Sequence, residues 1–238
     1  MKTSTRIKKI TDAIVKKYGL PKRNDATITP LDTLIGTILS QNTNDKNSYR
    51  AYQTLKKNYK SWFELLEIPE QQLKNDIKVA GLTDQKAGAI LGLLQYIREK
   101  SLSETLVELE QQSDDEILFE FTRLKGIGVK TVSCVLLFSL NRNICPVDTH
   151  VHRIVNRMGL VKGSAPDKTF ELLRPHIPAD HAHTFHTNLL RLGREVCTPT
   201  SPACGSCVVS KYCEYDNKDM THKRDSVVKD FFLLDSLY

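Results

Sequence analysis

The stretch Leu124-Lys125-Gly126-Ile127-Gly128-Val129-Lys130-Thr131 places two glycines, two residues apart, between segments that are both expected to be helical. On one side, 115–124 repeats apolar residues with the spacing of a single helical face, and on the other, 129–140 is apolar enough to form a buried helix. Gly126 is expected to end the first helix in a left-handed conformation, and Gly128 to let the chain turn tightly into the second. The stretch therefore predicts two helices joined by a short glycine hairpin.

Lys130 falls in the first turn of the second predicted helix. A cation is unfavourable there, because the N-terminus of a helix is already the positive end of its dipole. Two explanations remain open: an anion such as a phosphate lies nearby, or the lysine is needed as a neutral amine.

The rest of the chain also has the apolar spacing of helices, and no segment shows the sustained alternation of a strand, so the fold class is predicted to be all-α. Asp32 and Asp148 each precede an apolar run and are predicted to cap the N-terminus of the helix that follows. The predicted helices cover 7–18, 31–40, 46–58, 85–98, 115–124, 129–140, 149–159, 167–175 and 183–194.

Charge is distributed unevenly along the 238 residues, which carry 34 Lys and Arg against 28 Asp and Glu, a formal charge of +6. Residues 104–120 contain seven acids and no Lys or Arg, whereas 123–163 contain seven bases and a single acid, Asp148. Basic residues gathered around a glycine hairpin favour a polyanionic partner, although an ordinary solvated basic face would have the same composition.

Membrane insertion and export are not expected. The longest uncharged stretch, 33–44, has 12 residues and is interrupted by Gln, Asn, Ser and Thr, whereas a spanning helix needs about 20 apolar residues. The basic N-terminus is not followed by an apolar run of signal-peptide length. We therefore expect a soluble, cytoplasmic chain, associated with the nucleoid if the source is a prokaryote.

Four of the six cysteines lie close together in a C-x6-C-x2-C-x5-C pattern: Cys197, Cys204, Cys207 and Cys213. Disulfides are disfavoured, because a cytosol keeps thiols reduced. Zinc usually takes two close pairs separated by a longer spacer, whereas one compact loop suits a cubane iron–sulfur cluster better. The spacing favours the cluster and leaves zinc as the alternative. Cys134 and Cys145 are predicted to be small buried core residues.

Three motifs that are far apart in the sequence support the same interpretation. They are the hairpin 124–131, the segment Pro146-Val147-Asp148-Thr149-His150, and Leu192-Gly193-Arg194-Glu195-Val196-Cys197 with the cysteine loop that follows. Together they resemble the endonuclease III family, the bifunctional DNA glycosylase/AP lyases of base excision repair, over about residues 28 to 215. The cysteine spacing is the most specific part of the match.

The resemblance implies two all-α lobes that flank a DNA-binding cleft. A six-helix barrel with the helix–hairpin–helix would occupy 29–141, and the cluster lobe would combine 1–28 with 142–216. Residues 217–238 would form a C-terminal tail, longer than in the short members of the family.

The resemblance also assigns the chemistry. Lys130 would attack the anomeric carbon of the deoxyribose and form a Schiff base that permits β-elimination, and Asp148 would stabilise the positive sugar and assist deprotonation of the lysine. The four cysteines would hold a structural [4Fe-4S] cluster. The substrate would be an oxidised pyrimidine or an abasic site in double-stranded DNA, and the protein would act as a monomer.

DNA contacts are assigned by the same resemblance. The backbone N–H groups of Gly126 and Gly128 would hold a phosphate, while Gln41 and Leu82 would fill and wedge the duplex around an extruded base. As alternatives, Gln41 could be a surface glutamine and Leu82 a core leucine. Contacts to DNA are also expected from Lys125, which stands where the family often has proline, and from His150.

Other functions remain open. A mismatch or modified-base glycosylase of the same superfamily would remove thymine, uracil or adenine, and a non-catalytic iron–sulfur protein would use the hairpin for phosphate contact alone. In the tail, 225–232 has the hydrophobic spacing of a peptide that binds a sliding clamp, with Asp225 where glutamine is expected. Docking of Phe231, Phe232, Leu233 and Leu234 on the protein's own surface is the preferred interpretation.

Overall fold

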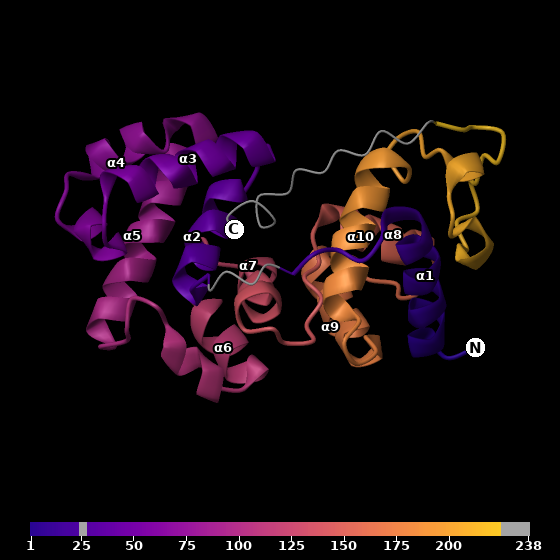
Figure 1. Ribbon diagram of the computed structural model, residues 1–238, viewed down its shortest axis with the longest axis horizontal. Helices are drawn as coiled ribbons and strands as arrows, with labels where there is room; N and C mark the ends of the chain where they lie inside the picture. The colour runs from indigo at the N-terminus through magenta and orange to yellow at the C-terminus, as the bar shows by residue number, and fades with distance from the viewer. Residues whose placement is uncertain (24–27, 225–238) are drawn as a thin grey trace. The chain divides into compact units, whose positions relative to one another are not determined.

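The computed structural model describes residues 1–23 and 28–224, and every regular element in these ranges is helical, so the all-α prediction is confirmed (Figure 1). The α-helices are α1 (Thr3–Tyr18), α2 (Pro30–Ser40), α3 (Asp45–Asn58), α4 (Glu70–Asp76), α5 (Thr83–Glu99), α6 (Asp114–Phe121), α7 (Val129–Cys134), α8 (Thr149–Arg157), α9 (Pro166–Leu173) and α10 (Ala182–Glu195). Short 3-10 or π segments connect them: η1 (Trp62–Leu66), η2 (Lys78–Ala80), η3 (Val107–Gln111), η4 (Val135–Ser139), η5 (Arg174–His176), η6 (Cys204–Ser206) and η7 (Ser210–Tyr212).

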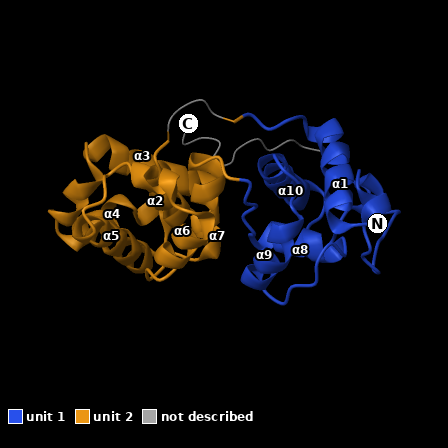
Figure 2. Ribbon diagram, turned by 90° about the horizontal axis from the view of Figure 1, so that it is seen from below, with its two compact units in different colours: residues 1–22, 143–230 blue, residues 23–142, 231–238 orange. Residues whose placement is uncertain are grey.

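The chain forms two compact units (Figure 2). Of the described residues, unit 2 takes those between Arg23 and Arg142 and holds α2 to α7. Unit 1 combines residues 1–22 with the described residues from 143 to 224, so that α1 belongs with α8, α9 and α10.

Unit 2 is built around α2, which contacts α3, α5 and α7 (Figure 1). The sequence explains this central position, because the helix is apolar on every side and all its residues except the last are buried. A helix without a polar face has to be surrounded by other elements.

Asp32 is not the N-cap of α2, so this prediction is wrong. The helix begins at Pro30, whose fixed φ suits the first helical position, and the hydroxyl of Thr29 caps it by accepting from the Asp32 N–H at 3.0 Å. The Asp32 carboxylate instead points into unit 2, where it accepts hydrogen bonds from Tyr52 Oη (2.8 Å) and Trp62 Nε1 (3.0 Å).

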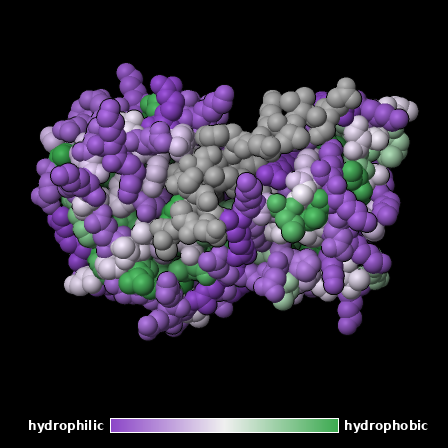
Figure 3. Space-filling view, viewed as in Figure 1, coloured by the Kyte–Doolittle hydropathy of each residue, from purple (hydrophilic) through white to green (hydrophobic). Residues whose placement is uncertain are grey.

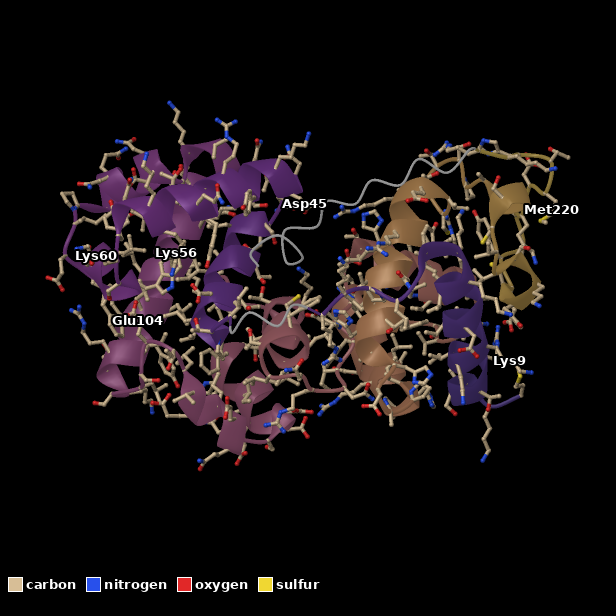
Figure 4. The ribbon with its side chains drawn as sticks, viewed as in Figure 1. Lys9, Asp45, Lys56, Lys60, Glu104 and Met220 are labelled. Carbon is tan, nitrogen blue, oxygen red and sulfur yellow. The ribbon has the colours of Figure 1, made fainter. Side chains whose placement is uncertain are left out.

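The charge on Asp32 is balanced locally. Burial works to raise the pKa of this carboxyl, but hydrogen bonds from Thr29 and Tyr52 and the charge of Lys56 outweigh it, and the pKa is lowered. The ammonium of Lys56, a residue labelled in Figure 4, lies 3.4 Å from Asp32 Oδ1 and 5.0 Å from the centroid of the Trp62 ring. This polar cluster supports the core of unit 2.

Unit 1 is held together by residues from both ends of its sequence. Helix α10 contacts α1 and α8, and α1 buries Ile7, Ile10 and Ile14. The Arg6 guanidinium donates to the carbonyls of Met158 at 2.7 Å and Tyr212 at 3.0 Å. The N-terminal helix is therefore fastened both to the end of α8 and to the cysteine loop.

None of the described helices combines the length and the apolar character that crossing a bilayer requires. The face of the molecule drawn in Figure 3 is mostly hydrophilic, with small separate hydrophobic areas.

Candidate functional site

The glycine hairpin follows α6 and leads into α7. Gly126 has a φ of +86°, the left-handed conformation that was predicted, but α6 already ends at Phe121, so Gly126 does not cap that helix. Gly128 is the N-cap of α7 with a φ of −98°, a conformation open to any residue, so the special glycine turn expected there is absent. Ile127 is buried and anchors the hairpin between the two glycines.

Gly126 also lies close to α5: a Cβ at this position would stand 2.7 Å from the Cβ of Ala89. Within the described part of the chain, the N–H groups of Gly126 and Gly128 donate to no other group. Two amides at a helix start that donate to nothing suit an anion such as a phosphate.

We predict that Gly126→Ala destabilises unit 2 by about 2 kcal/mol or more, because the left-handed conformation costs an L-residue about 1–2 kcal/mol and the new methyl group also meets Ala89. Gly128→Ala is the matched control, since a Cβ there meets nothing within 4 Å, and it should cost less than about 1 kcal/mol. Urea unfolding followed by circular dichroism measures both. Equal effects would contradict this account of the hairpin.

Lys130 is the second residue of α7 and is half-buried. Within unit 2, its ammonium makes no hydrogen bond and no ion pair with any described residue. A lysine that has no partner among the described residues of its unit, close in sequence to two backbone amides that donate to none of them, can react with a ligand or bind it.

Gln41 and Leu82 both lie in unit 2, in the loops that leave α2 and enter α5. The Gln41 side chain donates from Nε2 to the carbonyl of Gly126 at 3.0 Å, so it rests against the hairpin. Leu82 has a left-handed φ of 49° and is 44% exposed, so the alternative of a core leucine is wrong. An exposed leucine held in a strained conformation fits a residue that acts on a partner.

Lys86 joins these two loops and was not identified from the sequence. Its Nζ is buried and donates to the carbonyls of Leu39 (2.9 Å) and Ala80 (2.7 Å). The signal was present, because Lys86 shares one face of α5 with Ile90, Leu93 and Ile97, the apolar face of the helix. A lysine on that face has to be buried.

Asp148 caps α8, as predicted, by accepting from the N–H of Val151 at 2.8 Å through Oδ1. His150, two residues later, is half-buried and lies 3.1 Å from the Arg153 guanidinium. Burial lowers the pKa of His150, Asp148 raises it, and the positive Arg153 and Arg194 lower it further. Lys130 belongs to unit 2 and Asp148 to unit 1, so the two residues expected to be catalytic come from different units.

The four cysteines of the predicted centre line a single cavity, together with apolar residues of α8 and α10 such as Ile154 and Leu192. Burial, with smaller contributions from the three neighbouring cysteines, raises the pKa of the Cys207 thiol to about 11. Four thiolates can share this space only if a positive centre compensates their charge. The described residues contain no group of three His, Cys, Asp or Glu side chains arranged to hold one metal ion. Four cysteines that line one cavity are the set of ligands that a [4Fe-4S] cluster takes.

Arginines of α8 hold the cysteine loop. Arg157 donates to Cys197 Sγ (3.4 Å), to the carbonyl of Thr198 (2.8 Å) and to that of Pro199 (2.7 Å), and Arg153 donates to the carbonyl of Cys197. The loop has no Lys or Arg of its own between Cys197 and Cys204, and these α8 residues supply the positive charge beside it.

We predict that Arg157→Gln releases the cluster more easily, because the substitution removes both the donor to a ligating sulfur and the support of the loop backbone. Loss of such an outer contact typically costs tenfold or more in metal affinity, and we expect about tenfold faster bleaching by an iron chelator. Visible absorption of the cluster measures the rate. Lys162→Gln, an exposed base of the same unit, should bleach as the parent does. Equal rates for all three proteins would show that Arg157 is not needed.

The described part of the tail, 217–224, makes hydrogen bonds to the cysteine loop that precedes it. The N–H of Gly205 donates to the carbonyl of His222 at 3.0 Å, and the N–H of Arg224 donates to Ser206 Oγ at 2.9 Å. The residues suggested to bind a sliding clamp, 225–232, lie outside the described ranges. Cys134 and Cys145 are buried, as predicted.

Comparisons with known proteins agree with this geometry. Residues 35–178 match the family described as HhH-GPD superfamily base excision DNA repair protein, and residues 197–213 match the iron-sulfur binding domain of endonuclease III. The chain is 34% identical to endonuclease III of Thermotoga maritima over 209 residues, which cover 88% of this chain and 92% of that protein. It is 29% identical to endonuclease III of Escherichia coli, with coverage of 79% and 85%.

Solved structures give the same result. A non-covalent endonuclease III–DNA complex superposes with a TM-score of 0.73 and 25% identity, and covers 90% of this chain and 96% of that one. A trapped endonuclease III–DNA covalent intermediate gives a TM-score of 0.74 at the same identity and coverage.

Proposed function

Because this chain belongs to the endonuclease III family, we propose that it is a base excision repair enzyme, a DNA glycosylase with AP lyase activity that acts on oxidised pyrimidines in duplex DNA. The observation that carries the proposal is Lys130, an amine that has no partner among the described residues of its unit, beside the amides of Gly126 and Gly128, which likewise donate to no described group. The amides suit a backbone phosphate, and the amine suits the neighbouring sugar.

The proposed reaction has two stages. In the first, the neutral Lys130 amine forms a bond to C1′ of the deoxyribose, the glycosidic C–N bond breaks, and the base leaves with the bonding electron pair and takes up a proton. The sugar ring then opens to a Schiff base. In the second, a base removes a proton from C2′, and the bond between C3′ and the phosphate oxygen breaks; water finally releases the lysine.

Asp148 is the residue we propose to accept the proton from the lysine and to stabilise the positive sugar. One of its oxygens holds the N–H of Val151, so the carboxylate has a fixed orientation at the start of α8. The residues that would hold the [4Fe-4S] cluster are the four cysteines around one cavity, and the bound cluster would serve to cross-link the loop on which they lie.

Covalent trapping tests the proposal. The protein is incubated with a duplex that contains one abasic site, and borohydride is added to reduce the Schiff base. A cross-linked species is expected, together with cleavage on the 3′ side of the site when borohydride is omitted. Failure of the folded, cluster-containing protein to form either product would refute the lyase and leave the non-catalytic alternative.

A panel of duplexes, each with a single lesion, tests the substrate. Oxidised pyrimidines should be excised fastest. Faster removal of mispaired thymine, uracil or adenine would assign the chain to the mismatch-specific branch instead. We also propose that the enzyme acts as a monomer and in the compartment that holds DNA, the cytoplasm of a prokaryotic cell; sedimentation with and without DNA tests the first point.

A further inference from the structure

Lys86 is the largest fully buried side chain among the described residues, and it carries an amine that can be charged. The residue is 1% exposed. It lies in the first turn and a half of α5, in the same unit as α2, and those two helices are in contact (Figure 1). No carboxylate lies within ion-pair distance of its Nζ among the described residues. Its only polar partners there are the two carbonyls of Leu39 and Ala80.

Both carbonyls stand at the end of a helical segment. Leu39 is the penultimate residue of α2, and Ala80 is the last residue of η2. The final carbonyls of a helix lack partners within it, and they form the negative end of the dipole, so an ammonium is favourable beside them. One lysine therefore caps two helix ends that are 41 residues apart in sequence, Leu39 and Ala80.

The chain turns sharply after each capped end. After Leu39 it reaches Gln41 and then Asn42, which has a φ of 51°; after Ala80 it reaches Gly81 and Leu82, with φ values of 69° and 49°. Left-handed conformations of Asn and Leu persist only where the surrounding structure enforces them. The side chain of Lys86 holds the carbonyl of Leu39, three residues before Asn42, and that of Ala80, two residues before Leu82, so it fixes the backbone where each loop begins.

The same region reaches the hairpin. Gln41 donates to Gly126, and Gly126 approaches Ala89, which follows Lys86 by three residues on α5. The loops of Gln41 and Leu82 and the glycine hairpin are thus tied to one another by contacts that all lie within unit 2.

Packing alone does not explain a lysine at this position. Burial lowers the pKa of Lys86 to about 8, which shows that the charged form is held at a cost. An apolar side chain of similar length would fill the same space without that cost, but it would leave the carbonyls of Leu39 and Ala80 without this donor. The ammonium adds a geometric constraint, because its two hydrogen bonds hold two backbone carbonyls at a fixed separation.

We propose that Lys86 is a positioning residue for base extrusion, which holds the loops of Gln41 and Leu82 at a fixed separation so that both side chains enter the duplex together. The proposal rests on the proposed function. It assigns Lys86 to the opening of the duplex and not to the chemistry, because its amine is buried and does not reach the sugar.

Lys86→Met is the central variant, since methionine keeps the length of the apolar stem and removes both donors. Excision of a damaged base from a duplex requires extrusion, whereas cleavage at an abasic site in single-stranded DNA does not. We expect the single-turnover rate of excision to fall by about tenfold to a hundredfold, as for a comparable misplacement of a positioning group. Cleavage of the single-stranded abasic substrate should remain within about twofold of the parent.

Fluorescence gives a readout that would not change if Lys86 had only a structural role. A 2-aminopurine opposite the lesion brightens when the duplex opens, and the rate of this signal in stopped flow should fall in Lys86→Met together with excision. Lys57→Met, which removes an exposed lysine of the same unit, is the matched control and should leave all three rates unchanged. Cluster absorption and thermal unfolding confirm that each variant is folded.

Parallel loss of excision and of single-stranded cleavage in a folded Lys86→Met protein would overturn the proposal, and so would unchanged brightening. If Lys86→Met does not fold, Lys86→Gln decides. Its shorter amide side chain is expected to reach at most one of the two carbonyls, so excision should fall while single-stranded cleavage is retained, by a smaller factor than in Lys86→Met. Cleavage of single-stranded abasic DNA by the parent tests the proposed function separately, so failure of one proposal is distinguishable from failure of the other.

Discussion

Replacing Lys130 with glutamine is expected to abolish borohydride trapping on an abasic duplex and to lower the rate of strand cleavage by about a thousandfold or more. The amide cannot form a Schiff base, and removal of a covalent nucleophile costs most of the rate enhancement. The fold should survive, because Lys130 is half-buried and makes no hydrogen bond or ion pair with the described residues of its unit. Gel analysis of the trapped product measures the effect.

Lys125→Gln is the matched control, because Lys125 is an exposed lysine of the same hairpin. It should trap as the parent does and should bind DNA more weakly, with a salt dependence reduced by about one phosphate contact. Undiminished trapping in Lys130→Gln would show that another amine is the nucleophile.

Replacing Asp148 with asparagine should lower the single-turnover rate of excision by about a hundredfold to ten-thousandfold, the range for loss of a general base or a charge stabiliser. Asparagine is as good an N-cap as aspartate, so the hydrogen bond to the N–H of Val151 and the start of α8 should be retained. The variant therefore separates the chemical role of Asp148 from its structural role.

Asp148→Ser provides the control, since serine also caps helices and also lacks the carboxylate. Both variants should unfold close to the parental temperature and lose excision to a similar extent. Excision at the parental rate by either folded variant would contradict the catalytic role. If excision is lost only in proportion to stability, the role of Asp148 is limited to capping α8.

Local patterns predicted most of the fold. All nine predicted helices are present, although 129–140 continues past α7 as the π segment η4. Helix α4 was missed because only Leu73 of its seven residues is buried, which leaves no apolar stripe to detect. The sequence pattern predicts Asp32 as the cap of α2, but its carboxylate accepts hydrogen bonds from Tyr52 and Trp62, 20 and 30 residues away, which no local pattern indicates.

In the candidate site, too, residues in local sequence patterns could be predicted and residues that depend on distant contacts could not. The cysteines, Asp148 and the hairpin could be proposed as site residues from the sequence, because each belongs to a short motif with a specific spacing. Lys86 was missed because its partners, Leu39 and Ala80, contribute backbone carbonyls, and backbone carbonyls have no signature in a sequence. The exposure of Leu82 likewise depends on a backbone conformation that one apolar residue in a sequence does not reveal.

The division of the chain between the two units also sets an order for biosynthesis. Residues 23–142 emerge from the ribosome as one continuous piece and contain every helix that α2 needs around it. Helix α1 is made first, yet the surface that covers Ile7, Ile10 and Ile14 includes α10, more than 160 residues later. The apolar face of α1 can therefore be covered completely only after α10 has been synthesised. Cys213 follows later still, so the four cysteines that would hold the cluster are complete only after every residue of α2 to α7 has been made.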